Sequence, residues 1–416
     1  IVVEATGIRD IPSGPLLRIS SDKYLAGLTK LVDTIKTVSE GETRVLIQII
    51  DFLQIRRRPD QTKYLNRHLI LRPEHYVALS LPFEAENEPA VRSALLSLSP
   101  EDLESVLNQK EWEDLQYGYR ERITDTHLPH IAQLPEILPQ LFSDAAIRAE
   151  AAGFDGVELH YAHAYTMASF LSATNNRTDG YGNSLEGRLR LPLEVYRAVR
   201  EACSKDFVVG CRFLSDEIID QGTRIKEACS IAQALADAGM DFLSVSRGGK
   251  FDDAKQPRVG GAVYPYTGPS GYECMPSYIS DAQGPFGRNV EPVSLIRELL
   301  RQKGLYTPVV LAGGQYGFYQ AESLLKENKA DIVGFARQAL ADPDWFLKVK
   351  LGLGNQVRLC KYTNYCEGLD QKHKQVTCEL WDRENLEQSG IRKSHDGRRR
   401  LLAPEWSPPV TEPARK

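Results

Sequence analysis

The sequence predicts an α/β protein whose parallel β-sheet closes into a barrel. Seven short apolar runs rich in β-branched residues alternate with longer amphipathic stretches, which is the pattern of parallel strands with helices packed outside them. No Gly-x-Gly-x-x-Gly motif follows the first run, so the dinucleotide-binding signal of an open, doubly wound sheet is missing. The barrel is therefore favoured, and the open sheet is the alternative.

The predicted elements can be placed by residue number. The strands are expected at residues 1–6, 44–50, 156–160, 207–214, 241–246, 308–312 and 331–336. The helices between them are expected at residues 24–38, 136–152, 184–203, 224–238, 292–303, 320–328 and 343–351. A closed (β/α)8 barrel has eight strands, so we expect the missing first strand to precede Ile1.

Two long segments interrupt this alternation. Residues 51–135 are too long for a simple crossover and contain charged helical patterns at 99–108 and 111–122, which predicts an insertion on the barrel rim. Residues 247–290 are rich in Gly, Pro and Tyr and follow a strand, which predicts a loop over the barrel mouth, where active sites of such barrels lie.

The domain organisation follows from these segments. We expect a barrel over residues 1–358, a cysteine-containing extension over 359–387 and a mobile tail rich in basic residues and proline over 388–416.

Composition limits the possible partners. The 416 residues carry a formal net charge of −5 and contain no long Lys/Arg block, which argues against nucleic acid. No apolar run approaches the roughly 18 to 20 residues of a membrane span. Seven scattered cysteines do not form a disulfide framework, which is typical of a reducing cytoplasm. We therefore expect a cytoplasmic protein that acts on small molecules, and a homo-oligomer is compatible with the sequence.

The densest polar cluster follows the third predicted strand. His160, His163 and Tyr165 occur at the point where that strand ends, and strand ends face the barrel mouth. Two neutral imidazoles can each donate one hydrogen bond to a single substrate oxygen, and a phenol with a pKa near ~10 can deliver a proton. One alternative is that the histidines are structural. Another is a zinc site completed by Glu158 or Asp216.

Two further polar residues interrupt apolar strands. Arg212 lies in a strand whose other side chains are mostly apolar, so its guanidinium needs an anionic partner or several acceptors. Gln48 interrupts another strand, and its carboxamide can both donate to and accept from the edge of a heterocycle, or be a satisfied core residue.

The last two predicted strands are followed by a candidate phosphate site. Gly313 and Gly314 follow one strand and Arg337 follows the next. Loops at the corresponding positions of (β/α)8 barrels commonly bind phosphate through backbone N–H groups, and an arginine completes the charge.

At these residues the chain resembles the old yellow enzyme family of FMN-dependent ene-reductases, including its dienoyl-CoA reductase relatives. The strongest match is GFDGVELHYAHAY at residues 153–165, followed by FLSATNNRTDGYGNSLEGR at residues 170–188. Weaker matches occur at residues 4–6, 47–48, 209–212, 312–314 and 334–343. The resemblance covers most of residues 1 to about 380 and implies a (β/α)8 TIM barrel with FMN at its mouth.

The resemblance also implies roles for individual residues. The positions that match FMN contacts are Ala5, Gln48, Arg212, Gly313, Gly314, Ala336 and Arg337. His160 and His163 match the pair that binds the substrate oxygen, and Tyr165 matches the proton donor. Tyr264 and Tyr266, in the predicted mouth loop, are expected to contact the substrate.

The chain departs from the family pattern in three places, of which one is minor: Ala164 and Gly187 replace a usual Gly and Asn. Residues 51–54 (DFLQ) replace the His and Gly-Arg that usually follow the Gln48 strand, which affects the loop that contacts substrate or nicotinamide. The relatives that bind an iron–sulfur cluster have four cysteines near residue 360, but here only Cys360, Cys366 and Cys378 remain, with Thr363 where another cysteine is expected. Since a [4Fe–4S] cluster has four thiolate ligands, we expect no intact cluster.

The leading functional hypothesis is therefore an NAD(P)H-dependent flavin oxidoreductase that reduces alkenes activated by a carbonyl or nitro group. Its cofactors are FMN, with NADH or NADPH as the reductant. The alternatives are a flavin-binding or ligand-binding barrel with impaired turnover, and a metal-dependent barrel hydrolase.

Overall fold

The computed structural model describes residues 1–12, 16–275 and 286–409, and parts of the predicted mouth loop and tail lie outside these ranges. Each of the seven predicted strands is present. They are β1 (Val2–Gly7), β2 (Leu46–Ile50), β3 (Gly156–Tyr161), β4 (Val208–Leu214), β5 (Leu243–Ser246), β6 (Val309–Ala312) and β7 (Ile332–Gly334).

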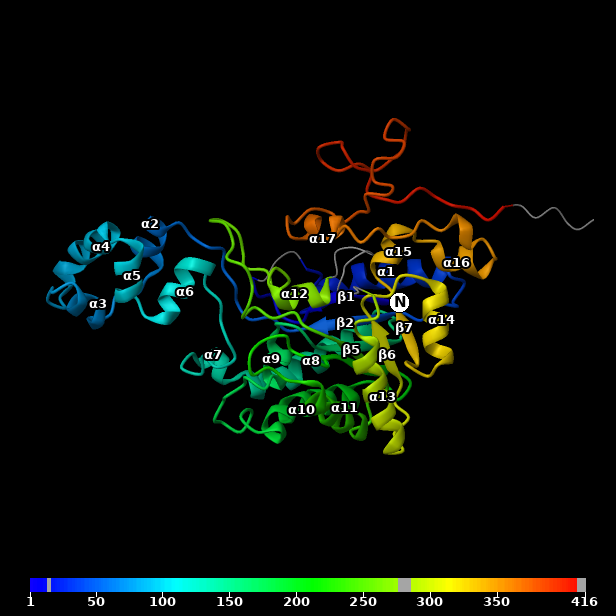
Figure 1. Ribbon diagram of the computed structural model, residues 1–416, viewed down its shortest axis with the longest axis horizontal. Helices are drawn as coiled ribbons and strands as arrows, with labels where there is room; N and C mark the ends of the chain where they lie inside the picture. Colours follow the sequence, from blue (N-terminus) through cyan, green and yellow to red (C-terminus); the bar gives the residue numbers. More distant parts are fainter. Residues whose placement is uncertain (13–15, 276–285, 410–416) are drawn as a thin grey trace, which may run out of the picture.

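The seven strands form one parallel sheet in chain order, from β1 at one edge to β7 at the other, and the sheet is curved (Figure 1). Because all strands run the same way, their carboxyl ends lie along one rim, and the loops that follow them meet there. In the described part of the chain, no strand joins β7 to β1. The predicted strand before Ile1 stays a prediction.

The predicted helices between the strands are also present. They are α1 (Leu25–Val38), α8 (Leu134–Ala151), α10 (Leu185–Ala202), α11 (Ile225–Asp237), α13 (Val290–Gln302), α14 (Phe318–Lys326) and α16 (Trp345–Lys350). Alternate strand residues, among them Ile47, Leu159 and Val209, are fully buried in the core that these helices cover. The Tyr161 hydroxyl donates to the Pro192 carbonyl of α10 at 2.9 Å, which fixes the helix-facing side of β3.

The residues that alternate with this apolar set give the other face of the sheet its polar character. Glu158 and His160 of β3 lie on that face, since side chains of a strand alternate between faces. Glu158 is the register partner of Gln48 in β2, and His160 is the register partner of Arg212 in β4. Arg212 is in turn opposite Ser244 in β5. The parallel register thus aligns polar residues that are far apart in the sequence.

Within residues 51–135, for which the sequence predicts a rim insertion, the chain forms a helical lobe that extends away from the sheet (Figure 1). It contains α2 (Gln61–Lys63), a π-helical turn (Tyr64–His68), α3 (Pro73–Ala78), α4 (Glu88–Ser97), α5 (Pro100–Val106), α6 (Gln109–Tyr117) and α7 (Pro129–Ala132). The two predicted helical patterns correspond to α5 and α6. The lobe has its own apolar cluster, in which Leu65, Val91 and Leu95 are fully buried.

The two ends of the lobe lie together beside the barrel mouth. Ile55 and Arg120 form an antiparallel bridge, and the Arg56 N–H donates to the Tyr119 carbonyl at 2.8 Å. The fully buried side chain of Arg177 donates to the Ile123 carbonyl at 2.5 Å, which ties the second end to the loop after α9 (Thr166–Leu171). These contacts fix residues of the lobe next to the carboxyl ends of the strands.

The C-terminal segment packs across the loops that follow β6 and β7. The Tyr362 hydroxyl donates to the Gln315 carbonyl at 2.6 Å, and the Trp381 indole donates to the Leu340 carbonyl at 2.9 Å. In Figure 1, α17 (Tyr365–Asp370) lies on the opposite side of the sheet from α10, α11 and α13. In the predicted tail, Arg399 is buried and donates to the Thr377 hydroxyl at 2.7 Å; the mobility of the tail stays a prediction.

None of the helices in the described ranges has the length and apolar character of a membrane span.

The separate apolar cluster predicts that the lobe can lose stability locally. Leu95→Ala removes a fully buried side chain from that cluster, which should cost about 2 to 5 kcal/mol because a cavity remains. Hydrogen exchange should then accelerate at residues 61–117 while β3 keeps its protection. Val77→Ala, at a position 74% exposed in the same lobe, is the matched control and should change little. Equal acceleration in the lobe and the sheet would show that the lobe has no independent stability.

Candidate active site

The centre of the candidate site is the turn between β3 and α9. His160 ends the polar row of β3, His163 lies in the turn, and Tyr165 is the N-cap residue of α9. The ring of His160 is 5.5 Å from that of His163 and 5.5 Å from that of Tyr165, measured between centroids. The structure therefore brings the predicted trio together at the barrel mouth.

The mouth loop closes over this turn at Gly249. Its φ of +73° suits glycine, and a Cβ atom there would lie 2.9 Å from Cδ2 of His163 and 3.0 Å from the Tyr266 ring. The Tyr266 ring is 5.6 Å from His163 and 5.3 Å from the ring of Tyr264. Tyr266 thus lies against the site, whereas the Tyr264 hydroxyl donates to Asp370 of α17 at 3.1 Å.

Arg212 lies next to the histidines on the polar face of the sheet. Its guanidinium donates to the hydroxyls of Ser244 at 3.0 Å and Ser246 at 3.1 Å. The Ser246 hydroxyl is also 2.9 Å from Nε2 of His163. Among the described residues, no carboxylate lies within salt-bridge distance of Arg212. Of the two alternatives that the sequence offers for this arginine, the described chain supplies hydroxyl acceptors, and the carboxyl of Glu158 interacts with its charge without forming an ion pair.

Gln48 is held by the neighbouring strand. Its side-chain amide donates to the buried carboxyl of Glu158. Burial raises the pKa of Glu158, although the Arg212 charge and the hydrogen bond from Gln48 act in the opposite direction. Gln48 is thus positioned on the polar face, with a partner that sequence reasoning did not assign to it.

Burial sets the protonation states of the central trio. It lowers the pKa of His160 to about 3 and that of His163 well below its usual value, and the nearby Arg212 charge lowers both further. Burial, assisted by the charge of Asp370, raises the pKa of Tyr165 to about 12. At neutral pH the site therefore presents two uncharged imidazoles and a protonated phenol. Nδ1 of each histidine is buried and has no hydrogen-bond partner among the described residues.

A second group of predicted residues follows β6 and β7. Gly313 and Gly314 have φ angles of +88° and +71°, and they directly follow Ala312, the register partner of Gly334 in β7. Ala336 precedes α15 (Arg337–Ala341), so Arg337 begins that helix. The adjacent strands therefore bring the glycine pair and the arginine to the same edge of the sheet.

The surroundings of these residues are polar. The Arg337 guanidinium lies 4.8 Å from the centroid of the Tyr362 ring and donates to Asn364 at 2.5 Å. Oε1 of the buried Gln315 has no partner among the described residues. Ala5 lies at the far side of the sheet, where the pairing of β1 with β2 shifts register between Val3 and Thr6.

The side chains proposed for a zinc site have other partners. The Glu158 carboxyl accepts from Gln48, and the Asp216 carboxylate is paired with Arg224 at 3.0 Å and Arg247 at 3.1 Å. Within the described ranges, no three His, Cys, Asp or Glu side chains are arranged to hold a metal ion. The arrangement gives the zinc alternative no support.

The three cysteines of the extension lie near one another. Burial raises the pKa values of Cys360, Cys366 and Cys378, and Cys360 and Cys366 both act on the charge of Cys378. The Thr363 hydroxyl donates to the Glu379 carboxylate at 2.7 Å. The expectation that this segment holds no intact iron–sulfur cluster stays a prediction.

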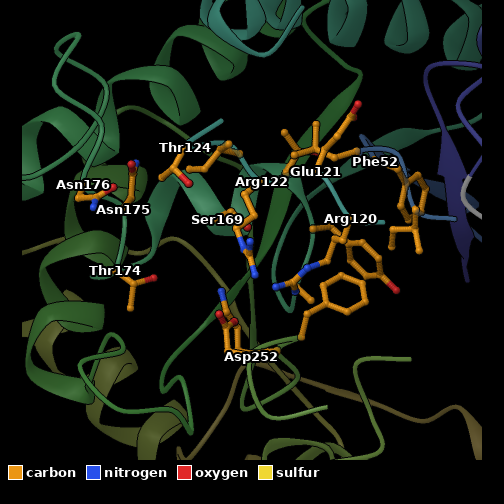
Figure 2. Close-up of a pocket in the computed structure, with 18 residues that line it drawn as sticks. Phe52, Arg120, Glu121, Arg122, Thr124, Ser169, Thr174, Asn175, Asn176 and Asp252 are labelled. Atoms are coloured by element: carbon orange, nitrogen blue, oxygen red, sulfur yellow. The ribbon is translucent and has the colours of Figure 1, made fainter. Parts of the chain in front are cut away.

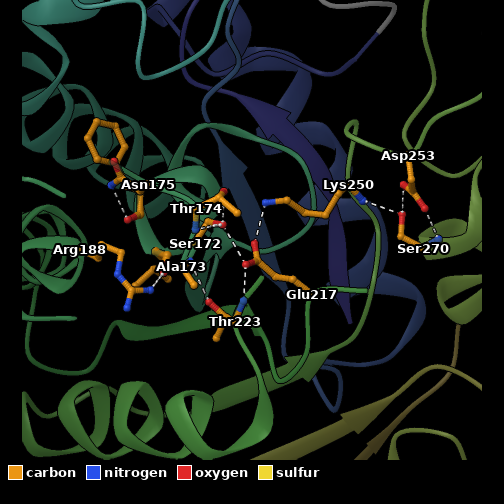
Figure 3. A network of polar contacts seen from close by, with 12 residues as sticks. Ser172, Ala173, Thr174, Asn175, Arg188, Glu217, Thr223, Lys250, Asp253 and Ser270 are labelled. Carbon is orange, nitrogen blue, oxygen red and sulfur yellow. Dashed lines mark hydrogen bonds and ion pairs between the residues drawn. The ribbon is translucent and has the colours of Figure 1, made fainter. Parts of the chain in front are cut away.

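Sequence reasoning missed a buried ion pair beside the trio. Nζ of Lys250 in the mouth loop lies 2.7 Å from Oε1 of Glu217, and their side chains are 4% and 2% exposed (Figure 3). Burial alone would raise the pKa of Glu217, but the Lys250 charge and the hydrogen bonds hold it below its usual value. Single charged residues in two loops carry no sequence pattern that predicts their pairing.

The ion pair belongs to a network that joins three loops. The second oxygen of Glu217 accepts from the Ser172 hydroxyl at 2.8 Å and the Thr223 N–H at 2.7 Å. The backbone N–H of Lys250 donates at 3.1 Å to the hydroxyl of Ser270, which lies in the first turn of α12 (Pro269–Cys274). The network therefore fixes the mouth loop against the loops that follow α9 and β4.

Known proteins share this arrangement of sequence and fold. The sequence model of the NADH:flavin oxidoreductase / NADH oxidase family matches residues 131–356, which include the β3–α9 turn, Arg212 and the loops after β6 and β7. The chain belongs to this family. The predicted family resemblance is thereby confirmed.

The relatives extend beyond the region of similarity. NADH oxidase from Thermoanaerobacter brockii is 35% identical to this family member over 231 residues, which are 55% of the chain and 31% of the relative. A probable NADH-dependent flavin oxidoreductase of Bacillus subtilis is 28% identical over 59% of the chain and 58% of its own length. The chain thus spans less than two thirds of the length of either relative.

Solved structures share the fold of this family member. A 2-naphthoyl-CoA reductase complex matches with a TM-score of 0.60 and 19% identity, over 91% of the chain and 48% of the other protein. Morphinone reductase in complex with tetrahydroNAD matches with a TM-score of 0.50 and 24% identity, over 85% of the chain and 78% of the other protein. The likeness establishes an α/β fold of the TIM-barrel type.

The Lys250–Glu217 pair predicts a strong effect of removing one partner. Lys250→Met should lower the free energy of unfolding by about 3 to 5 kcal/mol, because Glu217 is left as an unpaired buried charge. Lys250 holds the folded-state pKa of Glu217 low, so the stability from this pair is present above about pH 4.5 and is lost as pH falls through the folded-state pKa. The deficit of the variant should therefore shrink in acid, as measured by urea denaturation. The double variant Lys250→Met/Glu217→Leu should recover most of the loss; no recovery would contradict the pairing.

Proposed function

We propose that this protein is an FMN-dependent NAD(P)H oxidoreductase that reduces C=C bonds activated by a carbonyl or nitro group. The observation that carries the proposal is the pair of buried Nδ1 atoms of His160 and His163, which have no partner among the described residues, beside the protonated phenol of Tyr165. Membership of the NADH:flavin oxidoreductase / NADH oxidase family supports the cofactor pair. The seven free cysteines support the predicted reducing cytoplasm.

The residues around the polar face fit FMN. Arg212 has no carboxylate within salt-bridge distance in the described chain, so its charge is available to the anionic pyrimidine edge of a reduced flavin. The positive-φ glycines Gly313 and Gly314, together with Arg337, suit a phosphate group. Gln48 and the backbone at Ala5 and Ala336 are the remaining proposed contacts. When bound, FMN supplies the hydride chemistry that no side chain here can perform.

The histidine pair holds the oxygen that activates the substrate. Both imidazoles are neutral at neutral pH, so each can offer one N–H donor without the cost of a second buried positive charge near Arg212. Hydrogen bonds to this oxygen withdraw electrons from the conjugated C=C bond, which makes its β-carbon electrophilic. The Tyr266 ring beside His163 limits where the substrate can lie.

Tyr165 is the proposed proton donor to the α-carbon. Its raised pKa keeps the hydroxyl protonated until charge develops on the substrate. Its ring is fixed edge-on between Phe52, at 4.9 Å between centroids, and Phe251, at 6.1 Å. These contacts hold the phenol at the mouth.

The proposal is tested with the purified protein supplied with FMN. An absorbance spectrum from about 350 to 500 nm should show bound flavin, NADH or NADPH should bleach it anaerobically, and a cyclic enone should restore the colour. A protein that does not retain FMN would overturn the proposal. A bleached flavin that enones and nitroalkenes fail to reoxidise would overturn the substrate class.

The histidine pair gives a prediction for ligand binding. His160→Ala combined with His163→Ala should weaken binding of phenols and enones by about 1.5 to 3 kcal/mol for each hydrogen bond lost to an anionic oxygen. Retention of FMN should be unaffected, because the pair acts on the substrate oxygen and not on the phosphate. Spectral titration of the bound flavin with a phenol measures the affinity. Equal affinity of variant and native protein would remove the histidines from the substrate site.

Tyr165 gives a prediction for the two half-reactions. Tyr165→Phe should slow alkene reduction by about 10² to 10⁴-fold while flavin reduction by NAD(P)H keeps its rate, since only alkene reduction needs the proton. Because the Tyr165 pKa is about 12, its hydroxyl stays protonated between about pH 7 and about pH 10. The rate of alkene reduction by the native protein should therefore not fall in this range through ionisation of Tyr165. Stopped-flow absorbance resolves the two steps. Equal slowing of both would assign Tyr165 a structural role.

A further inference from the structure

Tyr165 lines a cavity of about 250 Å³ that extends from the barrel mouth toward the helical lobe (Figure 2). Residues from three segments form its walls. The lobe contributes Phe52, Leu53, Ile55 and residues 120–124, the barrel contributes residues 164–166, 169 and 174–176, and the mouth loop contributes residues 250–252. The cavity thus continues from the proposed proton donor into a part of the molecule outside residues 131–356.

Most charged groups on these walls have partners within the chain. Lys250 is paired with Glu217, and the Arg122 guanidinium is paired with Glu113. The Glu121 carboxylate accepts from the Gln54 N–H at 3.0 Å and lies 2.9 Å from the His130 ring nitrogen. These groups are therefore held by contacts that do not require a ligand.

Arg120 is different. Its guanidinium forms no hydrogen bond or ion pair with the residues that the structure describes, although it is partly buried and lies 5.0 Å from the Phe251 ring centroid. Figure 2 shows Arg120 and Arg122 directed into the cavity, with Asp252 on the opposite wall. Burial, together with the neighbouring charge of Arg122, lowers the pKa of Arg120 to about 10, although the charges of Asp252, Glu113 and Asp125 act in the opposite direction. A partly buried guanidinium that makes no hydrogen bond is costly, and an anionic ligand in direct contact would offset that cost.

The geometry relates this cation to the reaction. Phe251 contacts both groups, since its ring faces Arg120 on one side and the Tyr165 ring on another. A ligand in the cavity can therefore place its reactive end at Tyr165 and its other end at the guanidinium. The apolar side chains of Phe52, Leu53 and Ile55 suit the hydrocarbon between the two ends.

We infer that Arg120 binds a carboxylate at the far end of the substrate, so that this protein acts on unsaturated carbonyl compounds that carry an acid group. The inference rests on the proposed function, because Tyr165 marks the reactive end. A guanidinium recognises carboxylate and phosphate alike, so a phosphate of NAD(P)H is the other possible source of the anion.

The experiment compares an acid with its neutral analogue on the FMN-loaded protein. The probes are 4-(3-oxobut-1-enyl)benzoic acid, an enone with a distant carboxylate, and its methyl ester. Arg120→Gln should lower the ratio of kcat/KM for the acid to kcat/KM for the ester by about 10- to 100-fold, which is the usual effect of one charged hydrogen-bonding contact. Asp252→Asn should raise that ratio, because it removes the carboxylate that faces Arg120.

Arg56→Gln is the matched control. Arg56 belongs to the same lobe and also lies over an aromatic ring, 4.9 Å from the Tyr119 centroid, but it does not line the cavity. This variant should leave the ratio as it is in the native protein. An equal effect of Arg56→Gln and Arg120→Gln would overturn the inference, because it would reflect the overall charge of the lobe.

Further outcomes separate the inference from the proposed function. If Arg120→Gln raises the KM for NADH or NADPH and affects acid and ester alike, the anion belongs to the nucleotide and the inference is wrong. If the native protein reduces neither probe, the proposed function fails, and calorimetry with the saturated acid 4-(3-oxobutyl)benzoate decides the anion site. Binding that weakens in Arg120→Gln supports the site, and binding that is absent or unchanged overturns it.

Discussion

The parallel register of β3, β4 and β5 is the constraint on which the rest of the site depends. It places Arg212 between His160 on one strand and Ser244 on the next, on the face of the sheet turned away from the helices. The guanidinium then orients Ser246, which contacts His163, and its charge helps to keep both imidazoles neutral. A shift of one residue in this register would turn the polar side chains of a strand to the face covered by the helices, and the site would be lost.

The loops above the sheet need a different source of order, because the register of the strands does not extend to them. The buried pair of Lys250 and Glu217 provides it at the cost of desolvating two charges, which is acceptable only because Glu217 also accepts from Ser172 and Thr223. Such a pair fixes one arrangement of the loops rather than adding much net stability. This ion pair also fixes the position of Phe251, which follows Lys250 in the chain and lies beside Tyr165.

The sequence predicted the elements whose signal is local. The seven strands of the described ranges were all identified, because β-branched runs between amphipathic helices have a regular pattern. The short helices α2 to α4 of the lobe were not predicted, since they are stabilised mainly by a cluster that forms only when they pack together. The trio of His160, His163 and Tyr165 was found because it lies in one short motif. Arg120 and the Lys250–Glu217 pair were missed because their meaning depends on contacts between distant segments.

This division between local and distant signals coincides with a division in the molecule. The family region, residues 131–356, contains the histidines, Tyr165, Arg212 and both glycine and arginine loops, which are the groups proposed to handle electrons and protons. Arg120 and Phe52 lie before that region, in the ends of the helical lobe that the Ile55–Arg120 bridge holds against the barrel mouth. Substitutions that shift the strand register would displace all of the residues that this register aligns. The lobe has its own apolar cluster, so substitutions there can leave the register unchanged. The inferred selection of the substrate by Arg120 would therefore act where the constraint from the barrel is weakest, through a guanidinium that forms no hydrogen bond or ion pair with the described residues.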